Sequence, residues 1–127
     1  MSTNIVARQM VRSVVADLGP SNMGAGNGFT AKLPQGAVLA RLIALTITAF
    51  NSATTSTLTV TDGTTVFVNA VDVQSTGSET VANAPKFYPA GGELQFNLAE
   101  TGAAATAGRV VVIAEYYSVG IGDEVYG

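Results

Sequence analysis

Apolar and polar residues alternate along most of this chain with a period of two, which is the spacing of a β-strand. The clearest example is residues 93–98, where leucine or phenylalanine alternates with glutamate, glutamine or asparagine. Because successive side chains of a strand point to opposite faces, this segment predicts one face in the core and one in water.

Residues 36–63 are the stretch around which we expect the fold to be organised. Residues 41–50 are rich in large apolar and β-branched side chains at both parities, which predicts a strand buried on both faces. Residues 57–61 alternate threonine with Leu58 and Val60, which predicts a second strand with one wet face. Asp62-Gly63 then supplies a turn.

Several other segments also have the pattern of apolar residues that is typical of a β-strand. The first apolar segment, residues 5–18, also fits a loose helical stripe, but its β-branched residues favour a strand, chiefly from Met10 onward. In residues 64–73 the apolar parity changes, which predicts a bulge near Asn69-Ala70. Residues 74–85 are predicted to be a polar connection. The other strands are expected at residues 29–33, 86–89, 93–98 and 109–117, the last of them central because it is apolar at both parities.

About eight short strands and no convincing helix predict an all-β protein, an antiparallel two-sheet β-sandwich of the jelly-roll type. A length of 127 residues fits a single domain, residues 1–127. Residues 1–12 are expected to form a flexible N-terminal arm. Residues 118–127 are expected to form an irregular C-terminal tail.

Composition excludes several classes of function. The chain contains no cysteine and no histidine, which excludes thiolate chemistry, histidine-based catalysis and zinc sites built on these residues. A net charge of −3 and six scattered basic residues lack the positive footprint of a nucleic-acid binder. No apolar segment is long enough to span a membrane or to serve as a signal peptide, so we expect a soluble product made in the cytoplasm.

Charged residues make up only 12% of the chain, about half the usual share, against 47% hydrophobic residues. Such a surface predicts that copies of the chain or a partner cover much of it. Glu115 lies in an otherwise apolar strand, so we expect it to pair with Arg41 or Arg109, or to be exposed at an edge or a subunit contact. Asp62 is explained by its turn, and Asp62 with Asp72 is too little for a calcium site. We predict no catalytic residue, no metal site and no cofactor.

Four blocks of sequence, in this order, carry a resemblance to a known family: LPQGAVLARL, TAFNSATTSTLTVTDGTT, KFYPAGGELQFNL and AGRVVVIAEYYSVG. Across residues 33–117 the chain resembles the small jelly-roll decoration, or cement, proteins of tailed-bacteriophage capsids. The resemblance implies a virion structural protein that is not an enzyme. It implies copies, as trimers, on the outer capsid surface, where they clamp neighbouring major capsid proteins.

The two ends of the chain are expected to reach those neighbours, since segments that become ordered on binding suit this task. The predicted capsid or subunit contacts are Ile5, Val6, Arg8, Met10, Arg12, Tyr88, Tyr117, Ile121 and Tyr126. Two alternatives stay open at this point. One is a tail or fibre component of the same physical kind, and the other is a carbohydrate-binding jelly roll that stacks sugars on Phe87 and Tyr88.

Overall fold

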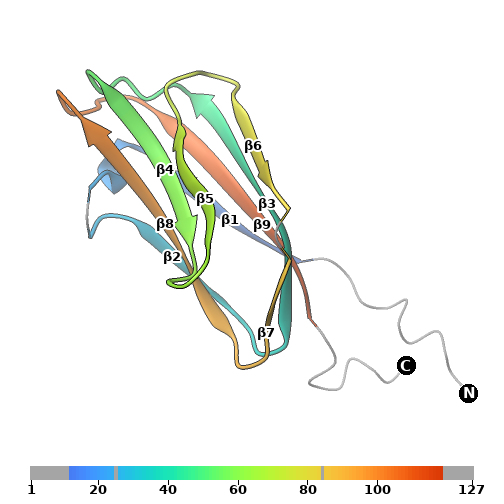
Figure 1. Ribbon diagram of the computed structural model, residues 1–127. Helices are drawn as coiled ribbons and strands as arrows, with labels where there is room; N and C mark the ends of the chain where they lie inside the picture. The colour runs from blue at the N-terminus through green and yellow to red at the C-terminus, as the bar shows by residue number, and fades with distance from the viewer. Residues whose placement is uncertain (1–11, 25, 84, 119–127) are drawn as a thin grey trace, which may run out of the picture.

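Two antiparallel β-sheets packed face to face make up the protein in the computed structural model (Figure 1). The structure describes residues 12–24, 26–83 and 85–118. The larger sheet has the strand order β1 (Arg12–Leu18), β9 (Arg109–Ser118), β3 (Ala37–Thr48) and β6 (Glu79–Ala82), with β7 (Lys86–Tyr88) also paired to β3. The smaller has the order β2 (Phe29–Leu33), β8 (Gly92–Thr101), β4 (Thr55–Thr61) and β5 (Val66–Asp72).

This strand order confirms the predicted jelly-roll sandwich. When the short β7 is set aside, the eight remaining strands form two four-stranded sheets whose neighbours are mostly distant in sequence, as in a double Greek key. The described residues therefore contain nine strands instead of about eight, and one short 3-10 helix, Pro20–Asn22. No helix within these residues is long and apolar enough to cross a membrane.

The core lies between the sheets and follows from the period-two patterns. On β8 the alternate residues Leu94, Phe96 and Leu98 are buried, as predicted. They meet Val110, Val112 and other inward-facing residues of the opposite sheet. Since both sheets supply one apolar face each, the two inner faces close a single hydrophobic core.

Two local predictions are confirmed. Residues 12–18 form a strand and not a helix, with Ala16 and Leu18 buried on its inner face. The pairing of β4 with β5 shifts register after Leu58, and Ala70 has a positive φ of 48°, so β5 carries the expected bulge. The Ala70 amide there donates a hydrogen bond to the Thr59 hydroxyl.

Two other predictions were wrong. Residues 74–85 contain β6, which pairs with β3; its polar sequence is typical of an edge strand, which needs few apolar residues. β3 is not buried on both faces either. Its inner residues are buried, but its outward Ile43 and Leu45 are only half-buried, because the described residues form no third layer over this sheet.

The described chain enters and leaves the sandwich at one place. Arg12, the first residue of β1, lies opposite Tyr116 near the end of β9 (Figure 1). Arg12 and Ser118 therefore belong to strands, one residue inside the predicted arm and tail. The remaining arm and tail, residues 1–11 and 119–127, lie outside the described residues.

Candidate functional site

Six ionisable side chains of the described residues form three ion pairs. Glu115 Oε1 lies 2.5 Å from Arg41 Nε, which confirms one of the two predicted partners. Arg109 instead binds Asp17 at 2.9 Å, and its hydrogen bond lowers the pKa of that exposed carboxyl. The same part of the chain contains no group of three or more acidic side chains placed to hold a metal ion.

The third ion pair, between Lys86 and Asp62, joins the two sheets. Asp62 lies in the turn between β4 and β5, where its Oδ1 accepts hydrogen bonds from the amides of Thr64 and Thr65. Its Oδ2 accepts hydrogen bonds from Lys86 and from the Tyr88 hydroxyl, both on β7. The Asp62 side chain is only 4% exposed, so this cluster is an inter-sheet latch.

Burial and hydrogen bonding have opposite effects on the pKa of the Asp62 carboxylate. Burial alone would raise the pKa of Asp62, but the hydrogen bonds from Lys86, Thr65, Thr64 and Tyr88 together lower it well below its usual range. Burial and the bond to Asp62 raise the pKa of Tyr88 above its usual value. The carboxylate is therefore a structural anion and is not tuned to accept a proton near neutral pH.

We expect Asp62→Asn to lower the free energy of unfolding at pH 7 by about 2 kcal/mol, because the charge-assisted bonds to Lys86 and Tyr88 are lost. The folded-state pKa lies below the unfolded one, so the carboxylate stabilises the fold above about pH 4 and stops doing so as the pH falls further. Urea unfolding between pH 7 and pH 2 should show the variant and the unsubstituted protein converging in acid.

The control for this prediction is Asp17→Asn. Asp17 also pairs with an arginine, but both partners are about half exposed, so its loss should change stability much less. Equal losses for the two variants would contradict the latch.

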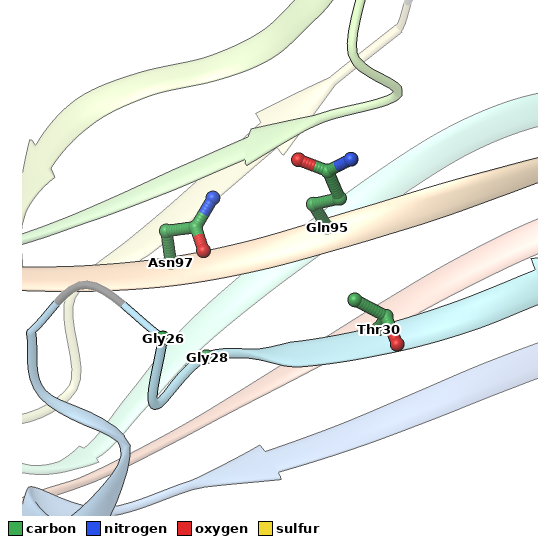
Figure 2. A pocket seen from close by; sticks show the side chains of 5 residues that line it. All are labelled: Gly26, Gly28, Thr30, Gln95 and Asn97. Atoms are coloured by element: carbon green, nitrogen blue, oxygen red, sulfur yellow. The ribbon is translucent and has the colours of Figure 1, made fainter.

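The outer face of the four-stranded sheet is polar and contains a small hollow. Its volume is about 170 Å³, and it is lined by Gly26, Gly28, Thr30, Gln95 and Asn97. Figure 2 shows both amide side chains projecting from the same side of β8, beside the loop that carries the two glycines. A Cβ on Gly28 would lie 2.6 Å from Asn97 Oδ1, so glycine is what lets the loop approach β8.

This hollow gives little support to the carbohydrate-binding alternative. Its five lining residues include no aromatic side chain on which a sugar could stack. Tyr88, the expected stacking residue, is 6% exposed and its hydroxyl is bound to Asp62. Phe87 is exposed, but it lies on the other sheet.

The outer face of the five-stranded sheet is different, because it is mainly apolar. We call this surface the apolar face. Five of its side chains are large, hydrophobic and more than a third exposed: Val15, Ile47, Val81, Phe87 and Tyr117. Half-buried aliphatic residues lie between them, namely Val38, Ile43, Leu45, Val111 and Ile113. Concentrated exposed apolar area of this kind marks an interaction surface.

The predicted contact residues fall into three groups. Ile5, Val6, Arg8, Met10, Ile121 and Tyr126 lie outside the described residues. Arg12 is exposed at the start of β1, and Tyr117, 44% exposed, belongs to the apolar face. Tyr88 differs, since the latch holds it inside the sandwich, and we remove it from the contact surface.

Sequence reasoning missed most of the apolar face, although its signal was present. The central strands β3 and β9 are apolar at both parities, and this was interpreted as burial on both faces for β3 and as a central position in the sheet for β9. A jelly roll of two layers buries only one side of each strand, so the second apolar parity forms an exposed apolar surface of the kind that marks an interaction site.

Comparison with known proteins agrees with this fold. A chain of the cyanophage Pam1 capsid asymmetric unit is similar with a TM-score of 0.64 and 21% identity, covering 87% of this chain and 86% of that chain. The acid-stable capsid of Helicobacter pylori bacteriophage KHP30 contains a chain with a TM-score of 0.54 and 18% identity, covering 85% and 93%. For the capsid of Ralstonia phage GP4 the values are 0.52 and 17%, covering 89% and 86%.

These similarities establish a shared fold with chains of three phage capsids. No family model matches the sequence, and no curated protein is similar to it at a significant level.

Proposed function

We propose that the protein is a bacteriophage virion structural protein that decorates the outer surface of the capsid and stabilises contacts between major capsid proteins. The observation that carries the proposal is the apolar face, because so large an exposed apolar surface on a rigid sandwich favours a protein that works as part of an assembly. The shared fold with chains of the Pam1, KHP30 and GP4 capsids supports a place in the virion.

This role requires binding and rigidity but no chemistry. In the described residues the three ion pairs hold strands and sheets together, which fits a passive mechanical part. The ends of the described chain leave the sandwich side by side, so residues 1–11 and 119–127 start from one place on it. We propose that these ends reach adjacent capsid subunits. The resemblance to cement proteins implies that copies act together as trimers.

We expect the purified protein to co-sediment with undecorated phage capsids and to saturate at a fixed number of copies per capsid. Decorated capsids should also resist heating to a higher temperature than undecorated ones, because each bound copy stabilises the assembled state. Sedimentation with increasing protein, followed by densitometry, measures the first effect. Calorimetry of the same capsids measures the second.

Two further samples complete this test. A chain lacking residues 1–11 should remain folded but bind more weakly if the arm reaches a neighbour. Capsids that already carry their decoration should not bind more protein. Protein that stays in the supernatant with undecorated capsids, but sediments with purified tails, would replace the capsid role with a tail or fibre role.

A further inference from the structure

The apolar face fits a second copy of itself. We propose that two copies of the protein pair through this face, sheet against sheet, about a two-fold axis that runs parallel to the strands between β9 and β3. Such an interface is isologous. If one residue of the first copy contacts a second residue of the other copy, then the same contact occurs again with the two copies exchanged. This pairing favours a dimer over the trimer that the resemblance implies, and it holds whether or not the protein binds a capsid.

The first argument is the register of the aliphatic residues. One row of side chains crosses four adjacent strands on the apolar face: Val15, Ile113, Ile43 and Val81. The proposed axis exchanges β9 with β3, so it places Ile113 of one copy over Ile43 of the other. It also places Val15 over Val81, which are 55% and 44% exposed in the single chain. Aliphatic side chains thus cover aliphatic side chains along the whole row.

The second argument is charge. Beside the aliphatic row, Arg41 on β3 lies opposite Glu115 on β9 and forms an ion pair with it. The same axis places Arg41 of each copy over Glu115 of the other, so four charges alternate in sign. A purely aliphatic partner would bury this ion pair without compensation, whereas a second copy provides the complementary charges.

The charged residues at the edges of the sheet are also compatible with the pairing. Asp17 on β1 and Glu79 on β6 lie at opposite edges of the sheet, in the row on the other side of the aliphatic row from the central ion pair. The axis places Asp17 of one copy over Glu79 of the other, so two negative charges approach each other. Arg109 already binds Asp17, and the Asp17 side chain is 54% exposed. Because Arg109 offsets the charge of Asp17 and both acidic residues lie on edge strands, where solvent reaches them, we expect this repulsion to be small compared with the central contacts.

The third argument is area. The five strands of this sheet contain 36 residues, and each residue covers about 4.8 Å by 3.3 Å, which gives a face of about 570 Å² in projection. Protruding side chains raise the accessible area above this value, towards the ~800 Å² per partner of a stable interface. The apolar face is therefore large enough for a specific dimer, and two twisted sheets can pack on it in the aligned manner.

Charge reversal gives a specific test. Arg41→Glu leaves four negative charges at the centre of a pair, and Glu115→Arg leaves four positive charges. Each variant alone should be monomeric by light scattering, with self-association weakened at least about 30-fold. A mixture of the two should again form dimers, because the negative face of one variant complements the positive face of the other. Ion-exchange chromatography separates this mixed pair from either variant.

Two other variants protect the test against loss of folding. Val15→Asp adds a charge at an exposed position of the apolar face and should also give monomers. Its control, Thr30→Asp, adds the same charge to the exposed polar face of the other sheet and should leave the dimer intact. Circular dichroism and thermal unfolding confirm that each variant is folded.

Several results would overturn the pairing. They are a monomeric unsubstituted protein, a trimer, a dimer unaffected by Val15→Asp, or variants that fail to form a mixed pair although both are folded. A monomer that binds capsids and loses this binding in Val15→Asp would show that a shell protein covers the face. A dimer that does not bind capsids would refute the proposed function and leave the pairing intact.

Discussion

Replacing Phe96 with alanine is expected to lower the free energy of unfolding by about 3–5 kcal/mol, because it removes a large side chain from a closely packed core. Phe96 is fully buried near the middle of β8. It lies opposite Phe29 on one side and Val60 on the other. Its ring centroid is 5.8 Å from that of Phe29 in a tilted arrangement, so the substitution also removes an aromatic pair.

Urea unfolding followed by tyrosine fluorescence or circular dichroism measures this loss, at one protein concentration so that association does not change between samples. The control is Val66→Ala, since Val66 is half exposed on β5 of the other sheet, away from the apolar face. Its loss should cost less than about 1 kcal/mol. Similar costs for the two variants would contradict the placement of the core.

The burial of Phe96 could be predicted from the sequence, because it depends only on neighbouring residues of the same segment. Residues 93–98 alternate strictly, with apolar side chains at one parity and polar side chains at the other, so the inner face is determined once the segment is a strand. The turn at Asp62-Gly63 and the bulge at Ala70 were predictable on the same basis. Each depends on the conformation of a few neighbouring residues.

The features that could not be predicted depend on contacts between distant segments. β6 has a polar sequence and is a strand only because β3 offers an edge with free hydrogen-bonding groups. Tyr88 looked like a surface aromatic because its partner Asp62 is 26 residues away. Nothing in the neighbourhood of either residue in the sequence indicates the latch.

The apolar face was not predicted as an exposed surface for a different reason. The apolar pattern around Ile43 and Ile113 predicts that their side chains are shielded from water, but it does not tell whether the same chain or another molecule shields them. Burial on both faces was the simplest interpretation for a single chain. The structure shows that two layers use only one face, and the other apolar face then becomes evidence for assembly.

Gly108→Ala is the second substitution for which we expect a large effect, a loss of about 3 kcal/mol or more. Gly108 has a φ of +147°, a conformation that side chains disfavour. A Cβ at this position would also lie 2.4 Å from two ring atoms of Phe50, which is 2% exposed. The added methyl group must therefore displace a buried aromatic ring at the end of the core, in addition to straining the backbone.

Gly77→Ala separates these two causes. Gly77 also has a positive φ, of +84°, but a Cβ there would have no neighbour within 4 Å, so only the backbone strain of about 1 kcal/mol should appear. Phe50→Leu provides a further test, because a smaller side chain makes room for the methyl group. In a double-mutant cycle measured by urea unfolding, Gly108→Ala should cost less in the Phe50→Leu background than in the unsubstituted protein. Equal costs in both backgrounds would show that Phe50 and Gly108 do not limit each other, and the strain would then belong to the backbone alone.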